Sequence, residues 1–311
     1  MQILKKGSNI DLMGKRRMAI YFSGVLLLIA LGAIILRGLN LGIDFTGGTL
    51  VEVRYPEAIE LAVVREALGK DGFSEAVVQH FGTSKEVLVR LAPQEGVESA
   101  ELSDRAFRAM QGISSEAELR RVEFVGPQVG EELTEDGGLA MLYALIGILI
   151  YVGLRFEYRF AVGSVIALVH DVLITVGFFA LFQVEFDLPV LAAVLAVIGY
   201  SLNDTIVVFD RIRENFRKMR KGETVGIINT SINQTLSRTL ITSGTTLLVL
   251  IALFLFGGEI IHGFALALIV GVVIGTYSSI YVASTSVISM GVSRADLMPV
   301  KKDDEVVDEM P

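Results

Sequence analysis

The sequence of 311 residues has no cysteine and no tryptophan, and only 20% of its residues are charged. Without cysteine the chain cannot be a disulfide-framed secreted domain. Hydrophobic residues make up 52% of it and the mean hydropathy is +0.59, which excludes a disordered or collagen-like chain and exceeds what one soluble core would bury. The net charge of −8 argues against a nucleic-acid partner.

Residues and motifs for hydrolytic chemistry are also missing. The three histidines, His80, His170 and His262, have no zinc-ligand spacing, and the chain contains neither a P-loop nor a G-x-S-x-G motif. We therefore expect a protein that is not an enzyme and that uses no cofactor and no metal ion.

Six stretches are long and apolar enough to cross a bilayer as helices, which takes about 20 mostly apolar residues. The stretches are residues 18–36, 137–154, 160–184, 188–209, 239–258 and 263–286. The first resembles a signal peptide, but it is longer than a typical h-region and lacks a small-residue cleavage site, so we interpret it as a retained anchor. The sequence predicts an α-helical integral membrane protein with six transmembrane helices, five of them within residues 137–290.

Lysine and arginine are unevenly distributed between these stretches. Of the 27, 17 lie in the N-terminus, the second-to-third loop, residues 210–238 and the C-terminal tail, and the two short loops on the other side have none. Because short cytoplasmic loops are enriched in these residues, we predict that both termini are cytoplasmic. Residues 1–17 are then a cytoplasmic N-terminus and residues 291–311 a disordered acidic tail. The basic, amphipathic residues 210–238 are expected on the membrane surface.

Residues 37–136, between the first and second stretches, must then lie outside the cytoplasm. They hold 19 acidic and 10 basic residues, and their alternating and helical apolar spacings follow the order β-α-β-β-α-β. This order predicts an extracytoplasmic ferredoxin-like α+β domain. We expect a turn at residues 82–85 between its middle strands, and a polar linker from Gly126-Pro127 to the second membrane stretch.

Small residues mark the helix faces that pack together, because lipid gives helices no hydrophobic drive to associate. Gly263, Gly271 and Gly275 belong to a stripe that repeats at every fourth residue of the sixth stretch. This stripe predicts close packing against another helix. A similar stripe in the third stretch includes Asp171, and one in the fourth includes Asn203.

Two carboxylates, Asp171 and Asp204, lie inside predicted membrane helices. A charged group at membrane depth costs about 2.5–3.5 kcal/mol on insertion scales, so such residues face a bundle interior or water and often mark an ion path. Two plainer interpretations stay open: Asp171 fixes helix packing, and Asp204 lies in a wet interface. Because adjacent helical residues point about 100° apart, we expect no direct pairing of His170 with Asp171. Arg238 is either an ordinary positive-inside flank or, if it lies on the bundle side, a cation that reaches Asp204.

Several motifs resemble the bacterial SecF family and occur in the expected order between about residues 15 and 290. They are Gly42-Ile43-Asp44-Phe45-Thr46-Gly47-Gly48-Thr49, Val125-Gly126-Pro127, Ala167-Leu168-Val169-His170-Asp171 and, most specifically, the run from Ile198 to Asn215. The resemblance implies a protein translocase subunit of the bacterial inner membrane, in the resistance-nodulation-division superfamily. The rival interpretations are a small-molecule or lipid exporter half of that superfamily and a passive membrane scaffold.

The resemblance also implies partners and roles. The partners are SecD, the SecYEG translocon, membrane lipid and the exported preprotein, which would meet the external domain. The family's acid and arginine motifs for coupling to the proton-motive force fall on Asp204 and Arg238, and we add Asp171 and Asn203 to this predicted proton-coupling set. The turn formed by Asp44, Gly47 and Gly48 would transmit the movement, or would simply be a tight exit from the first helix, since Gly47-Gly48 permits positive φ.

Overall fold

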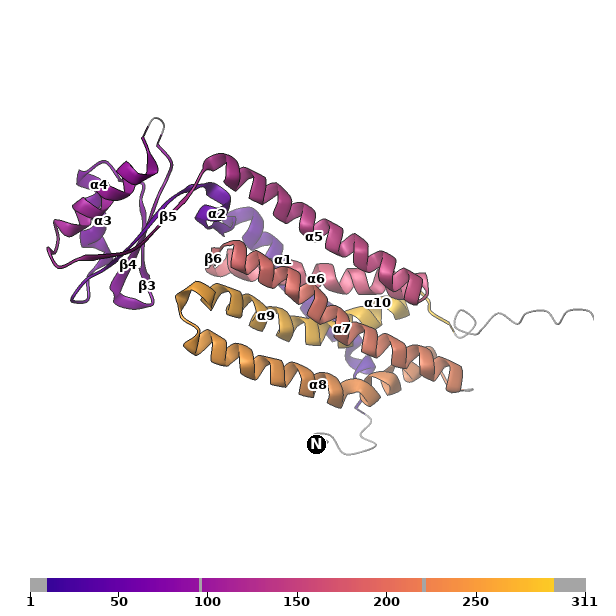
Figure 1. The fold of residues 1–311 in the computed structure, drawn as a ribbon. Helices are drawn as coiled ribbons and strands as arrows, with labels where there is room; N and C mark the ends of the chain where they lie inside the picture. Colours follow the sequence, from indigo (N-terminus) through magenta and orange to yellow (C-terminus); the bar gives the residue numbers. More distant parts are fainter. Residues whose placement is uncertain (1–9, 95–96, 220–221, 294–311) are drawn as a thin grey trace, which may run out of the picture.

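The computed structural model describes residues 10–94, 97–219 and 222–293, and it shows a helical bundle with a small α+β domain at one end (Figure 1). Six helices in these ranges are long and apolar enough to cross a membrane. The α+β domain lies between the first and second of them. The predicted fold class is therefore confirmed. Residues 1–9 and 294–311, which hold most of the predicted N-terminal segment and acidic tail, lie outside the described residues.

The membrane helices are α1 (Arg16–Arg37), α5 (Pro127–Arg155), α6 (Tyr158–Phe182), α7 (Leu188–Lys218), α8 (Thr224–Phe256) and a composite sixth helix. The sixth consists of α9 (His262–Ser278), a π-helical segment (Ser279–Ala283) and α10 (Ser284–Ser289). Helices α6 and α7 are the most buried of the six. The two intramembrane carboxylates therefore lie on the two central helices.

The external domain is a four-stranded antiparallel sheet with two helices on one face. Its elements are β2 (Gly48–Arg54), α3 (Leu61–Lys70), β3 (Val77–Phe81), β4 (Thr83–Leu91), α4 (Ser99–Gln111) and β5 (Glu118–Val125). The strand order is β3-β4-β2-β5, as the predicted β-α-β-β-α-β topology requires. Residues of β2 and β4 such as Val51, Val53 and Val89 pack under the helices. The turn before β4 is shorter than predicted, because Gly82 adopts φ +73° and reverses the chain alone.

The predicted linker after Gly126 is wrong. Helix α5 begins at Pro127, directly after β5, and continues unbroken to Arg155. Proline is favoured at the first helical position, where its missing N–H needs no partner and its fixed φ suits the helix. The polar residues that follow therefore form the end of the second membrane helix that lies next to the external domain (Figure 1).

The prediction that residues 210–238 lie on the membrane surface is also wrong. Helix α7 runs to Lys218 and α8 starts at Thr224, so most of the segment extends two membrane helices. Its apolar residues, including Ile212, Phe216 and Ile228, are buried in one cluster. The two apolar stripes face each other and not the lipid surface, and Arg217 and Lys218 are exposed at the end of α7.

Short elements attach the external domain to the bundle. Strand β1 (Asn40–Leu41), after α1, pairs in parallel with β6 (Glu185–Phe186), between α6 and α7. The short helix α2 (Ile43–Thr46) then leads into β2. The chain leaving α1 is therefore held against the loop that starts α7 before it enters the sheet.

Candidate functional site

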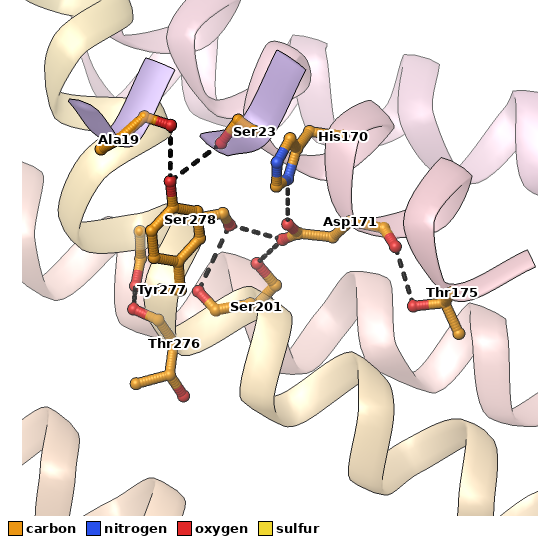
Figure 2. Close-up of polar contacts among 11 residues, drawn as sticks. Ala19, Ser23, His170, Asp171, Thr175, Ser201, Thr276, Tyr277 and Ser278 are labelled. Atoms are coloured by element: carbon orange, nitrogen blue, oxygen red, sulfur yellow. Dashed lines mark hydrogen bonds and ion pairs between the residues drawn. The ribbon is translucent and has the colours of Figure 1, made fainter. Parts of the chain in front are cut away.

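Asp171 of α6 lies at the meeting point of three helices (Figure 2). Its side chain is fully buried, and its Oδ2 accepts hydrogen bonds from Ser201 Oγ of α7 at 2.6 Å and Ser278 Oγ of α9 at 2.7 Å. Its Oδ1 lies 2.9 Å from His170 Nδ1. One carboxylate thus connects α6, α7 and α9, and any change in its charge acts on all three helices.

The expectation that His170 cannot pair with Asp171 is wrong. The Cβ atoms of adjacent helical residues point about 100° apart, yet the two side chains bring Nδ1 and Oδ1 within hydrogen-bond distance of each other. The other ring nitrogen, Nε2, is buried and has no hydrogen-bond partner among the described residues. The ring lies 6.3 Å from that of Tyr277, whose hydroxyl donates to Ala19 O at 2.8 Å and so ties α9 to α1.

Asp204 of α7 is the centre of a second polar cluster. Its side chain is 3% exposed, and its Oδ2 accepts a hydrogen bond from Ser243 Oγ of α8 at 3.3 Å. Ser243 in turn accepts one from Thr276 Oγ1 of α9 at 2.7 Å. Asp204 is one turn from Ser201 on α7, and Thr276 is two residues from Ser278 on α9. The two acidic clusters are therefore neighbours along one helix pair.

Arg238 lies on α8 near Asp204 without touching it. Its charge acts on Asp204 electrostatically, but its guanidinium makes no hydrogen bond or ion pair with the residues that the structure describes. It is exposed and lines a cavity of 280 Å³ together with Arg155 and Asp210. Asn203 is exposed on α7, beside Asp204. Of the predicted set, the structure places Arg238 near Asp204 without direct contact, puts Asp171 in an adjoining cluster, and turns Asn203 outward.

The hydroxyl partners of both acids were missed by sequence reasoning. Ser201, Ser243, Thr276 and Ser278 come from three helices and meet only in the fold. A partial signal was present, since Ser201 precedes Asp204 by one turn and Ser243 lies in a hydroxyl-rich run. The π-helical segment that begins directly after Ser278 gave no signal in the sequence, although such segments are frequent at functional sites.

Asp44, Gly47 and Gly48 lie where the external sheet meets the bundle. Asp44 Oδ2 accepts a hydrogen bond from the backbone N–H of Leu188, the first residue of α7, at 2.9 Å. Gly47 adopts φ +68°, and a Cβ on it would lie 2.8 Å from Pro127 Cα at the start of α5. Gly48 adopts φ +131°. Glycine is therefore required in this turn, and the Asp44 carboxylate joins the turn to the helix that carries Asp204.

The external domain and the loop before α7 are joined by a partly buried ion pair. Arg90 of β4 lies 3.1 Å from Glu185 Oε2 and donates to Leu41 O at 2.9 Å. Asp187, next to this ion pair, accepts a hydrogen bond from Val190 N and begins α7. Burial raises the pKa of Asp187 from its usual 3.8 to about 6, and the charges of Glu185 and Asp44 add to the rise.

The predicted glycine stripe of the sixth helix faces α7. A Cβ on Gly263 would lie 2.9 Å from Val190 Cγ2, one on Gly275 would lie 3.0 Å from Ser201 Cβ, and one on Gly271 would overlap the side chain of Val197. The close approach brings Thr276 and Ser278 within reach of the α7 cluster. Within residues 10–94, 97–219 and 222–293, no group of three or more His, Asp or Glu side chains is placed to hold a metal ion.

Comparisons with known proteins assign the family. The model described as "Protein export membrane protein SecD/SecF, C-terminal" matches residues 106–293, and the SecD/SecF GG motif matches residues 32–55, which include Gly47 and Gly48. The chain is 53% identical to protein translocase subunit SecF of Vibrio alginolyticus, covering 100% of this chain and 99% of that protein. The chain belongs to the SecF family of protein translocase subunits. It is accordingly a transport protein and not an enzyme.

Other relatives agree with this assignment. SecF of Pseudomonas aeruginosa is 50% identical, with 97% of this chain and 98% of that protein covered. The crystal structure of SecDF from Thermus thermophilus, described as a translocon-associated membrane protein, is 40% identical and superposes with a TM-score of 0.83 over 91% of this chain. This chain spans 39% of that SecDF chain, so the SecF family member corresponds to about two fifths of the longer protein.

Proposed function

We propose that this chain works with SecD to promote preprotein export at the SecYEG translocon of the bacterial inner membrane, and that the proton-motive force drives this work. The near full-length likeness to SecF subunits and the likeness to part of a SecDF chain support the partnership. A small-molecule exporter half, the rival within the superfamily, has no comparable support from these relatives.

The exposed face of α7 supports docking of a SecD helix. Ala192, Ala196, Gly199 and Asn203 lie one turn apart and are all exposed in this chain, whereas the other faces of α7 are buried against α6, α8 and α9. Small residues let helix backbones approach closely and are enriched where membrane helices pack together. A helix on this face would cover Asn203 and bring its own side chains beside Asp204.

The charge distribution supports an orientation with both termini in the cytoplasm. The start of α1 with Arg16 and the ends of α5 and α7 with Arg155 and Lys218 lie at the bundle end remote from the external domain (Figure 1). Short loops with lysine and arginine stay on the cytoplasmic side. The external domain then faces the space into which preproteins emerge.

Asp204 carries the proposed mechanism, because it is a buried carboxylate that links α7 to α8 and α9 under the influence of one cation. A proton that neutralises Asp204 removes its attraction to Arg238 and weakens its hold on Ser243. Moving one charge through 100 mV yields about 2.3 kcal/mol, whereas a hydrogen bond between membrane helices contributes about 0.6 kcal/mol on average. One proton therefore supplies enough free energy to exchange several such bonds and repack the helices.

The test combines this chain with SecD and SecYEG in vesicles and measures gradient-stimulated export. Asp204→Asn and Arg238→Met are expected to assemble normally and to abolish stimulation by the gradient. Glu214→Gln is the matched control, because Glu214 is an acid on the same helix that pairs with Arg211 and Lys218 and not with the tested residues. Unchanged stimulation in both variants would contradict proton coupling and favour the passive scaffold.

Contact with the preprotein is proposed at strand β5 of the external domain. β5 pairs with β2 on one side only, and it exposes Leu119, Val122 and Phe124 on the face that carries the helices. An open edge strand with apolar side chains can add an extended peptide as a further strand. A photoactivatable residue at Phe124 should crosslink to an exported chain during translocation, and one at exposed Val63 of α3 should not.

A further inference from the structure

The bundle has a second feature that the proposed function does not use, a cavity of 660 Å³ among α1, α6 and α10. Its walls are mostly apolar and include Ile20, Leu27 and Val169, and Ile20 and Val169 are exposed on the outer surface of the bundle. Gly24 also lines the cavity, and a Cβ at this position would have no neighbouring atom within 4 Å. The cavity thus opens toward the hydrocarbon region of the membrane.

Two residues that line the cavity carry buried polar atoms without a partner. Thr285 Oγ1 and His170 Nε2 are buried, and neither makes a hydrogen bond with the residues that the structure describes. Other membrane hydroxyls, such as Thr175 Oγ1 and Thr276 Oγ1, donate to the carbonyl four residues earlier. Thr285 follows the π-helical segment and makes no such bond. Leaving a buried polar group unpaired costs about 1–3 kcal/mol, so a side-chain rotation that presents the Thr285 hydroxyl to a polar group of a ligand in the cavity is favourable.

The charged end of the cavity favours an anion. Ala19 and Ile20 line the cavity on α1, and Arg16 precedes Ile20 by four residues, so it lies on the same face one turn closer to the basic end. Arg16 Nη1 donates to Met13 O at 3.0 Å, and within the described residues its guanidinium makes no ion pair. Asp11, the acid nearest in sequence, accepts from Gly14 N. Arg16 is therefore available to a phosphate at the membrane surface.

We propose that this cavity binds one acyl chain of an anionic glycerophospholipid, with the phosphate at Arg16 and an ester oxygen at Thr285. The chain lies along Ile20 and Val169, and its far end covers His170 Nε2. The proposal does not depend on proton coupling.

Native mass spectrometry of the full chain purified with SecD tests the site. The complex is exchanged into detergent with phosphatidylglycerol or phosphatidylcholine, and retained lipids are counted. We expect one retained phosphatidylglycerol in the parent and in Gly32→Phe, and none in Gly24→Phe. Gly32 is the matched control, because it lies on the same helix, also in open space, but outside the cavity. Equal retention in both glycine variants would overturn the proposal.

The contribution of the Arg16 charge is tested separately with variants that leave the cavity open. Arg16→Gln is expected to weaken phosphatidylglycerol retention about fivefold, the effect of one membrane-surface cation, and to remove the preference over phosphatidylcholine. Arg17→Gln, an exposed neighbour on a different helix face, is expected to leave retention unchanged. An equal loss in the two arginine variants would show general attraction to the membrane surface and contradict the site.

A fluorescence measurement covers the case in which Gly24→Phe fails to fold. The chain has no tryptophan, so Leu173→Trp introduces a single fluorophore at the deep end of the cavity. Phosphatidylglycerol brominated on its acyl chain should quench it with saturation at about one lipid per chain. Leu154→Trp, on the exposed surface of α5, should be quenched only in proportion to bulk lipid. Matching quenching curves at the two positions would refute the proposal.

Discussion

The contact between α7 and α9 yields a prediction whose magnitude follows from the structure. A methyl group on Gly271 would overlap the side chain of Val197, a buried residue in the middle of α7. Valine has one strongly preferred χ1 rotamer in a helix, so it cannot rotate away cheaply. Gly271→Ala should therefore push α9 away from α7 and destabilise the bundle.

The net effect of Gly271→Ala on the stability of the bundle combines two opposing contributions. Alanine gains about 1 kcal/mol over glycine in a helix interior, whereas overpacking a well-packed interface costs about 1–3 kcal/mol. Gly244→Ala on α8 measures the first contribution alone, because nothing lies within 4 Å of a Cβ at that position. Gly271→Ala should thus be about 1–3 kcal/mol less stable than Gly244→Ala. Val197→Ala removes the overlapping methyl groups, so the double variant should recover most of the loss.

Unfolding of the purified chain in mixed micelles, followed by circular dichroism over a range of denaturing detergent, provides the assay. The two single variants and the double variant form a double-mutant cycle with a favourable coupling between Gly271→Ala and Val197→Ala. Equal stability of Gly271→Ala and Gly244→Ala, or strict additivity in the cycle, would refute the packing argument.

Three further predictions concern the junction with the external domain. The pKa of Asp187 is about 6 in the folded chain and 3.8 ordinarily, so the folded state favours the protonated carboxyl. The free energy of unfolding should therefore fall as pH rises from about 4 to about 6, and Asp187→Asn should flatten this dependence. An unchanged pH profile in the variant would contradict the prediction. Gly47→Ala should destabilise the folded chain by about 1–3 kcal/mol in thermal unfolding, because Gly47 has a positive φ. Gly126→Ala should not, because a Cβ at that position meets open space. Equal effects of the two substitutions would count against a strained turn. Arg90→Met, which removes the ion pair with Glu185, should speed hydrogen exchange at β1 and β6. Lys70→Met, which removes the exposed Lys70–Glu66 pair, should not. Unchanged protection in Arg90→Met would show that the ion pair does not hold the external domain against the bundle.

The sequence was sufficient for the layout of the fold because each element carries a strong local signal. Apolar runs of about 20 residues have few other interpretations, and alternation against helical spacing separates strands from helices in the external domain. The two errors came from polar residues next to such runs. The residues after Pro127 and those at 210–218 and 224–238 look like linker and surface segments, yet they belong to long membrane helices, whose ends tolerate polar side chains.

The candidate site was only half visible in the sequence. Asp171 and Asp204 stand out because charges are rare in membrane helices. Their partners do not, because serine and threonine are common there and usually bond to their own backbone, as Thr175 and Thr276 also do. Which hydroxyls donate a hydrogen bond to a carboxylate depends on how closely the helices pack. That packing depends on glycine residues on a different helix from the carboxylate. The pairing of His170 with Asp171 depends in the same way on rotamers that Cβ directions do not reveal.

Helix α7 explains why the two interpretations of the Asp44 turn do not compete. Gly47 and Gly48 adopt the positive φ values that a tight exit turn needs, and the same turn places Asp44 on the first backbone N–H of α7. Ser201 and Asp204 lie on this helix, and residues 188–204 of a rigid helix span about 24 Å at 1.5 Å per residue. A tilt of α7 that follows a change at Asp204 must therefore either carry the Asp44 turn with it or break the hydrogen bond to Leu188. Because the turn continues into β2, the first course moves the external sheet, and the second releases it from the bundle.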